Sequence, residues 1–177
     1  MSSKNEKIVL GGGCFWCTDA VFSMLNGVAK TIVGYAGGNT QNPNYEQVCS
    51  GDTGHAEVTM VEYDPKVVSL GKILEVFFKM HDPTSLNKQG ADLGTQYRSI
   101  ILYTTQAQKE EAKEFINKVQ AGYGKPILTE LKKLDKFYPA EEHHQKYFEK
   151  NPFNGYCTFV VRPKVEKISK EFKSDLK

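Results

Sequence analysis

"GGGCFWCTDAVFSML", residues 11–25, places three glycines directly before two cysteines, two aromatic residues and an apolar run. The glycines follow a strand-like segment at residues 7–10, and the apolar run, stopped by an Asn-Gly pair, predicts a helix over about residues 15–25. A strand end, a glycine turn and a helix start therefore meet at Cys14. A cysteine pair at such a junction is a redox couple, half of a zinc site, or two buried filler residues.

Outward from this stretch, strand-like and helical segments mix without a strict alternation. Strands are predicted at residues 28–35, 57–63, 98–103, 127–131 and 158–161, and helices at residues 69–80, 105–120, 140–150 and 163–172. Residues 36–44 are loop by composition, and residues 82–96 form a long polar segment of the kind that is usually functional or disordered. The pattern predicts an α+β fold, with a mixed, mainly antiparallel sheet and helices packed on it.

The composition indicates an ordinary globular protein. The 177 residues suit a single domain, residues 1–177, with 40% hydrophobic and 25% charged residues. A net charge of +2 is too small to imply nucleic acid or a membrane surface as the main partner. No apolar stretch approaches the roughly 20 residues that span a bilayer. The polar residues 1–7 lack the pattern of an export signal, so a cytoplasmic location with unbridged thiols is expected.

The surroundings of the cysteine pair favour a reactive thiol over the other two alternatives. A helix N-terminus lowers the pKa of a thiol, so Cys14 is expected to be the better activated cysteine. Gly12 and Gly13 would let the backbone approach a substrate closely. The glycines do not form the dinucleotide-binding pattern, so no such cofactor is expected. A structural zinc site lacks a second ligand pair, because the remaining cysteines and the adjacent histidines 143–144 do not have the required spacing.

"GGGCFWC" resembles the signature of the methionine sulfoxide reductase A family. The resemblance continues in order through "VGYAGG" (33–38), "NPNYEQVCSG" (42–51), "TGHAEV" (53–58), "HDPTSLNKQGADLGTQYRS" (81–99), "PAEEHHQKY" (139–147) and "NPFNGYC" (151–157). It covers roughly residues 8–157 and implies a two-layer α+β sandwich with a ferredoxin-like core. The activity it implies is reduction of methionine (S)-sulfoxide, free or in proteins, through a cysteine sulfenic acid, without a cofactor or metal. It further implies recycling by thioredoxin or other thiols and repair of oxidative damage. A monomer is expected.

The resemblance also assigns roles to residues of one pocket. The catalytic set is Cys14 as nucleophile, Glu57 as acid, Tyr45 and Tyr97 as hydrogen-bond donors to the sulfoxide oxygen, and Asp92 as an orienting group; the substrate-binding set is Gly13, Phe15 and Trp16, with the two aromatic rings around the methyl group. A carboxyl in an aromatic pocket is desolvated, which raises its pKa, so Glu57 is expected to hold a proton near neutrality.

The resolving cysteine is where this sequence departs from the family pattern. Many members have glycine at the position of Cys17 and resolve through a cysteine that aligns with Cys157. Here Cys157 runs into the β-branched segment 158–161, and a stiff strand would swing poorly into disulfide range. Cys17 lies about one helical turn from Cys14 and is therefore the favoured resolving cysteine, with Cys157 as the alternative and direct reduction by outside thiols as a third route. Cys49 is expected to be a buried structural thiol.

Two rival functions remain open on the sequence. A general dithiol–disulfide oxidoreductase could use Cys14 and Cys17 as its active pair, although the βαβ unit that usually surrounds such a site is not expected here. A non-catalytic zinc-binding interaction domain is the rival from a different class, and it too lacks a second ligand pair.

Overall fold

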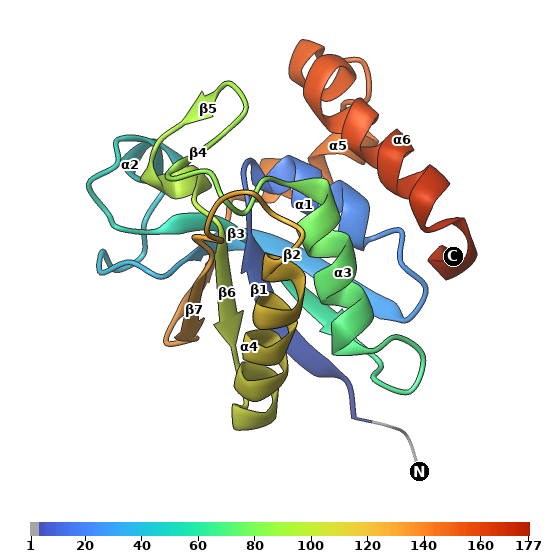
Figure 1. Cartoon of the computed structure of the whole chain (residues 1–177). Helices are drawn as coiled ribbons and strands as arrows, with labels where there is room; N and C mark the ends of the chain where they lie inside the picture. The colour runs from blue at the N-terminus through green and yellow to red at the C-terminus, as the bar shows by residue number, and fades with distance from the viewer. Residues whose placement is uncertain (1–3) are drawn as a thin grey trace.

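The computed structural model describes residues 4–177 and contains a six-stranded mixed sheet with helices packed on it (Figure 1). The strands are β1 (Glu6–Gly11), β2 (Val28–Ala36), β3 (Ala56–Tyr63), β6 (Ile100–Tyr103), β7 (Glu130–Lys133) and β8 (Phe137–Pro139). Their order is β7-β6-β1-β3-β2-β8, and every neighbouring pair is antiparallel except β6 and β7, which are parallel. The predicted α+β class with a mixed, mainly antiparallel sheet is confirmed.

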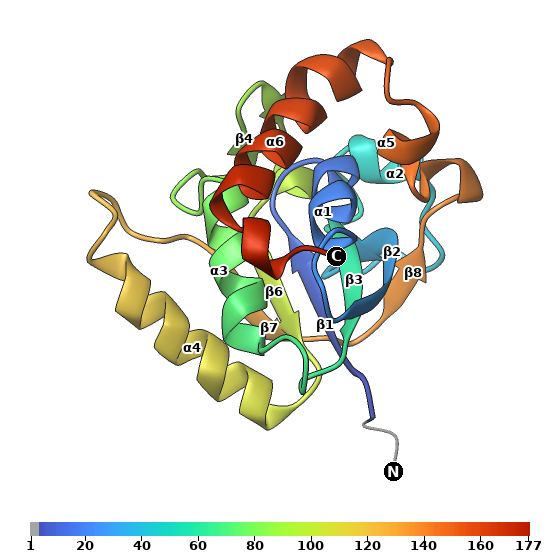
Figure 2. The same ribbon diagram turned by 90° about the vertical axis from the view of Figure 1, so that its right-hand side faces the viewer.

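The helices cover the sheet and close one of its ends. They are α1 (Phe15–Phe22), α2 (Tyr45–Cys49), α3 (Leu70–Met80), α4 (Gln106–Gln120), α5 (Tyr147–Lys150) and α6 (Arg162–Glu171). Ser69 caps α3 by accepting a hydrogen bond from the Lys72 amide, and Pro163 occupies the first turn of α6, where its missing N–H costs nothing. Helix α6 packs on both α1 and α3, so the C-terminal segment lies over α1 (Figure 2).

Alternation along the strands sends side chains to two hydrophobic clusters on opposite faces of the sheet. In β1, Ile8 and Leu10 join the large cluster under the helices, whereas Val9 joins a smaller cluster on the other face. In β3, Val58 belongs to the smaller cluster, so its neighbour Glu57 faces the helices. The hydroxyls of Thr18 and Thr59 lie 2.7 Å apart and fasten α1 to the same face of β3.

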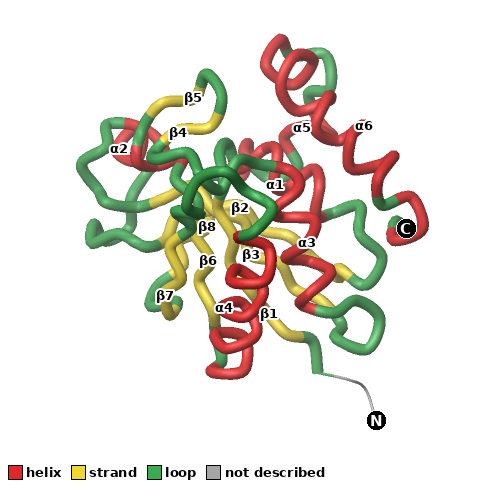
Figure 3. Tube along the Cα trace, in the orientation of Figure 1, coloured by secondary structure: helices red, strands yellow, loops and turns green. Residues whose placement is uncertain are grey.

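Several short elements gather near the start of α1. Helix α2, the short hairpin of β4 (Lys88–Gln89) and β5 (Asp92–Leu93), and helix α5 all lie beyond this end of the sheet, in the upper half of Figure 3. A 3-10 turn, Thr95–Tyr97, links the hairpin to β6. Residues 82–96, which were predicted as a long loop, therefore contain the β4–β5 hairpin and the start of the 3-10 turn.

Residues 158–161 are not a strand, so that prediction is wrong. They belong to a π-helical turn, Cys157–Val161, that runs directly into α6. Both Cys157 and Val161 are fully buried, and this spacing of four residues packs one helical face against the core. The Thr158 amide donates to the Asn154 carbonyl at 2.9 Å, which begins the helical hydrogen bonding. Tertiary packing thus overrides the β-propensity of the branched side chains.

Other predicted boundaries shift for local reasons. The helix expected at residues 140–150 is split into a 3-10 turn, Glu142–His144, and α5, because Lys146 between them has a positive φ of 54°. The strand expected at 127–131 is found at Glu130–Lys133, and β8 and α2 were not predicted. None of the helices within residues 4–177 is long and apolar enough to cross a membrane. Residues 1–3, which begin the segment expected to lack an export signal, lie outside the described residues.

Candidate active site

Cys14 is the N-cap residue of α1 and sits directly after the glycine turn. Gly13 has a φ of +90°, a conformation that suits glycine, and its amide donates to the Tyr97 carbonyl at 3.1 Å. The Cys14 carbonyl accepts the first helical hydrogen bond, from the Cys17 amide at 3.1 Å. The Cys14 side chain is 8% exposed, so the thiol is buried at the helix start rather than presented to solvent.

The pKa of Cys14 departs from the expectation for a helix N-terminus. Burial is the largest influence and raises the pKa of this thiol well above its usual value, and the nearby Glu57 and Cys17 raise it further. A hydrogen bond from the Trp16 amide, together with one from the Tyr156 side chain, acts in the opposite direction without overcoming burial. The lowered pKa expected for a thiol at a helix N-terminus is therefore not found, and burial favours the neutral form of Cys14.

Glu57 lies beside the nucleophile, at the start of β3 and on the face of the sheet that carries α1. Its side chain is 1% exposed, and Oε1 accepts the Phe15 amide hydrogen at 3.2 Å. Burial raises the pKa of this carboxyl from 4.5 to about 8, against the lowering effect of the Phe15 hydrogen bond. Oε2 is buried and has no hydrogen-bond partner within residues 4–177. The predicted rise in the pKa of Glu57 is confirmed, and Oε2 of the protonated carboxyl is available to a substrate as a hydrogen-bond donor.

Aromatic rings enclose the space around these two groups. Phe15 stacks with Tyr45 at a centroid distance of 6.5 Å and lies 5.3 Å from the His144 ring. Trp16 stacks face to face on Tyr147, with centroids 3.7 Å apart and planes within 5°. The nucleophile and the carboxyl therefore lie at a buried site beside aromatic side chains.

Tyr45, Tyr97 and Asp92 reach this site from three different segments. Tyr45 begins α2, which Asn44 and Gln47 cap reciprocally, and Tyr97 ends the 3-10 turn before β6. Burial, and then the nearby Glu57, raise the pKa of both tyrosines, so each phenol keeps its proton as a hydrogen-bond donor. Asp92 accepts a hydrogen bond from the Tyr156 hydroxyl, and its charge adds to the rise in the Glu57 pKa.

Several residues of the site had no assigned role in the sequence analysis. His144 is buried and accepts the Trp16 indole N–H at its Nδ1, at 3.2 Å, which fixes the indole plane. Tyr147 stacks on that indole, and Tyr156 meets it edge-on at 5.6 Å. Glu141 accepts both the Tyr35 hydroxyl and the Tyr45 amide. Their only signal in the sequence was membership of the blocks 139–147 and 151–157.

The four cysteines are all free thiols. Cys17, in α1, and Cys157, in the π-helical turn that packs against α1, are both fully buried. Burial raises the pKa of Cys17 to about 11, although the Lys164 ammonium acts to lower it. Cys17 also raises the pKa of Cys14. Cys49 is half-buried at the end of α2. Within residues 4–177, no group of three or more His, Cys, Asp or Glu side chains is placed to hold a metal ion.

This arrangement combines three elements of one reaction type. A sulfur nucleophile, a carboxylic acid with an available proton and an apolar wall lie together, and two phenols add neutral hydrogen-bond donors. Such a site suits a substrate in which one atom carries both an oxygen and an apolar group. The sulfur can attack that atom while the carboxylic acid protonates its oxygen.

Comparisons with known proteins agree with this chemistry. Residues 6–176 match the family model described as "Peptide methionine sulfoxide reductase". A peptide methionine sulfoxide reductase MsrA of Nautilia profundicola is 58% identical over 164 residues, covering 93% of this chain and 94% of the relative. The crystal structure of reduced Mxr1 from Saccharomyces cerevisiae has a TM-score of 0.83 at 39% identity, with 89% of this chain and 91% of that chain covered. The structure of Mxr1 in complex with Trx2 has a TM-score of 0.60 at 30% identity, with 83% and 87% covered.

The match spans nearly the whole chain and includes every segment that builds the pocket around Cys14 and Glu57. The chain therefore belongs to the peptide methionine sulfoxide reductase family.

Proposed function

We propose that this protein reduces methionine (S)-sulfoxide, free or in proteins, to methionine and thereby repairs oxidative damage. The observation that carries the proposal is the Glu57 carboxyl, which is protonated at neutral pH and bonded to the amide that follows Cys14. The name shared by the relatives, peptide methionine sulfoxide reductase, supplies the substrate.

In the proposed complex, the substrate sulfur lies against the Cys14 thiol and its methyl group against Phe15 and Trp16. The buried aromatic surface favours the methyl group because it is removed from water there. The sulfoxide oxygen faces Glu57 Oε2, which has no other hydrogen-bond partner within the described residues. Tyr45 and Tyr97 donate to the same oxygen, and Asp92, together with the Gly13 turn, orients the substrate chain.

The reduction step transfers the oxygen atom from substrate to enzyme. Cys14 sulfur attacks the sulfoxide sulfur while Glu57 donates its proton to the sulfoxide oxygen, and the thiol proton returns to Glu57. The sulfur–oxygen bond of the substrate and the transient sulfur–sulfur bond then break, the hydroxyl oxygen becomes bonded to Cys14 sulfur, and methionine leaves, reduced by two electrons. Cys14 is oxidised to a sulfenic acid, and the protons and the oxygen are all accounted for.

We propose Cys17 as the resolving cysteine, with Cys157 as the alternative. The Cys17 thiol attacks the sulfenic sulfur of Cys14, which releases water and leaves a disulfide. The proximity of Cys17 to Cys14, one turn along α1, supports this order. The argument from a stiff strand after Cys157 no longer applies, because residues 157–161 are helical.

Thioredoxin is the proposed reductant of that disulfide, and the complex of Mxr1 with Trx2 supports this assignment. The proposed setting is a reducing compartment, the cytoplasm, and the four free thiols support it. We also propose a monomeric single domain over residues 1–177. A ferredoxin-like, two-layer core of β1-α1-β2-β3-α3-β6 is supported by the strand order β6-β1-β3-β2.

The test is turnover of each sulfoxide epimer of N-acetylmethionine, first with dithiothreitol and then with thioredoxin and its reductase. The S epimer should yield methionine with both reductants, and the R epimer should yield none. Absence of product from both epimers, combined with rapid reduction of insulin disulfides, would instead establish the rival dithiol–disulfide oxidoreductase.

A further inference from the structure

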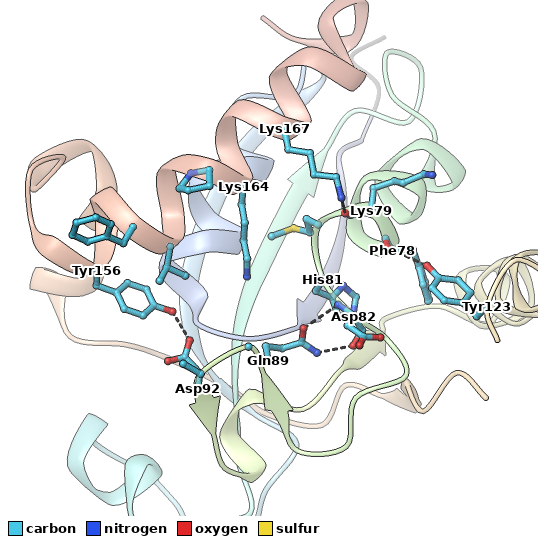
Figure 4. Close-up of a pocket in the computed structure, with 16 residues that line it drawn as sticks. Phe78, Lys79, His81, Asp82, Gln89, Asp92, Tyr123, Tyr156, Lys164 and Lys167 are labelled. Carbon is cyan, nitrogen blue, oxygen red and sulfur yellow. Dashed lines mark hydrogen bonds between the residues drawn. The ribbon is translucent and has the colours of Figure 1, made fainter. Parts of the chain in front are cut away.

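A cleft of about 880 Å³ is lined in part by Asp92 and Tyr156, two residues of the site described above (Figure 4). Its walls come from the end of α3, the β4–β5 hairpin, Tyr123, the π-helical turn and the first turns of α6. The volume falls within the range of sites that enclose a small ligand or a few residues of a peptide. A groove of this kind differs from the broad, flat area that two folded proteins share.

The cleft adjoins the reaction site, because two residues belong to both. Asp92 and Tyr156 line the cleft, and Tyr156 also meets the Trp16 ring edge-on. Gln89 lines it too, and a Cβ atom placed on Gly13 would lie 3.2 Å from Gln89 Cβ. A molecule that fills the cleft would therefore touch Gln89, which packs against the residue that precedes the nucleophile.

Lys164 brings a positive charge to the same point. Its side chain hangs from α6 into the cleft, as Figure 4 shows, and its Nζ lies 3.9 Å from the Cβ position of Gly13. Within residues 4–177 this ammonium group has neither an ion-pair partner nor a hydrogen-bond acceptor; Lys79 and Lys167 add two further cations to the lining.

The two acidic residues of the cleft are already engaged elsewhere. Asp82 accepts hydrogen bonds from the amide and the hydroxyl of Thr84, at 2.9 and 2.6 Å, and Asp92 accepts one from Tyr156. Neither carboxylate forms an ion pair with Lys164. An apolar surface lies beside the free cation, since Phe159 is 81% exposed on the cleft wall.

We propose that the cleft binds the polypeptide segment next to the oxidised methionine, and that Lys164 selects segments carrying an aspartate or glutamate close to that methionine. This proposal rests on the proposed function and extends it to the sequence context of the substrate. The acidic side chain of the bound segment pairs with the Lys164 ammonium, while apolar atoms of the segment cover Phe159.

The experiment uses three N-acetylated, amidated peptides that contain methionine (S)-sulfoxide and differ at one neighbouring position, which holds Glu, Gln or Lys. N-acetylmethionine sulfoxide serves as a substrate without flanking residues. The quantity measured is kcat/KM for the sulfoxide with dithiothreitol, which reports binding and reduction rather than recycling. The unaltered protein should prefer the Glu peptide over the Gln peptide by about three- to fivefold, the size expected for a partly exposed ion pair.

The variant Lys164→Glu should reverse the preference, favouring the Lys peptide, with kcat/KM for N-acetylmethionine sulfoxide unchanged. Lys113→Glu, on the exposed face of α4, is the matched control and should keep the original preference. Equal rates for the three peptides with the unaltered protein would overturn the proposal. So would a Lys164→Glu variant that slows only the thioredoxin-driven reaction, because the cleft would then dock the reductant. Failure of the unaltered protein to reduce N-acetylmethionine sulfoxide would refute the proposed function itself.

Discussion

Replacing Glu57 with glutamine separates two consequences of burying a carboxyl beside the nucleophile, one for activity and one for stability. Glutamine keeps the shape of the side chain and can still accept the Phe15 amide hydrogen at Oε1, but it cannot donate an acidic proton. The variant should therefore reduce methionine sulfoxide about 10²- to 10⁴-fold more slowly, the usual contribution of general acid catalysis. It should also be more stable than the unaltered protein at neutral pH.

The size of the gain in stability follows from the pKa of Glu57, which is 4.5 in its ordinary state and about 8 in the folded protein. Because the folded-state pKa is raised, the contribution of this carboxyl to folding is fully present below pH 4.5 and is lost as the pH rises towards 8. Each pH unit costs about 1.4 kcal/mol, so at pH 7 the loss is about 3 kcal/mol. Glutamine escapes this loss, and for a chain of this length the midpoint of thermal unfolding should rise by roughly 6–12 °C.

The assay is urea unfolding at several pH values between 4 and 8, alongside single-turnover release of methionine. Glu57→Gln should unfold at higher urea than the unaltered protein at pH 7, and the difference should shrink to nothing near pH 4. Glu114→Gln, which changes an exposed glutamate on α4, is the control and should show no such pH-dependent gain. An equal or lower stability of Glu57→Gln at pH 7 would mean that the folded protein holds Glu57 ionised, and its role as the acid would be refuted.

Three further expectations concern the cysteines and a buried histidine. Cys14→Ala should release no methionine even in a single stoichiometric turnover, and a substantial yield would exclude Cys14 as the nucleophile. Peptide mapping after one turnover should find a Cys14–Cys17 disulfide; a Cys14–Cys157 peptide would reverse the order proposed for the two thiols. Burial lowers the pKa of His81 from 6.5 to about 4, so the unfolded chain binds a proton that the folded protein excludes as the pH falls between these values. At pH 4 this exclusion costs about 3 kcal/mol of the free energy of unfolding, so in urea unfolding His81→Gln should lose about that much less stability than the unaltered protein between pH 6.5 and pH 4. An equal loss in both proteins would contradict this assignment.

The junction around Cys14 could be predicted from the sequence because its determinants are local. The apolar strand, the glycines and the helix that follows are all encoded within residues 7–25, and the structure has them as β1, the turn and α1. The placement of Glu57 is different. As a polar residue beginning a strand, it gives no indication which face of the sheet it occupies, and only its family-like block pointed to the site.

Two predictions failed because they used local rules where distant contacts decide the outcome. The helix N-terminus does act on Cys14, through the amide of Trp16, but burial and the Glu57 carboxyl outweigh it. Residues 158–161 have the composition of a strand, yet the buried positions of Cys157 and Val161 make the segment helical. In both cases the deciding partners lie far away in the sequence.

The complete burial of Cys17 and Cys157 has a consequence for the timing of the catalytic cycle. A protein reductant must touch a sulfur atom to exchange with it, so a disulfide made from either of these residues has to surface before it can be reduced. Cys157 begins the π-helical turn Cys157–Val161, which packs against α1, so a local opening of this turn would bring such a disulfide to the surface. Reduction of the disulfide could then be no faster than the opening of this turn, and that opening would set an upper limit on the turnover rate.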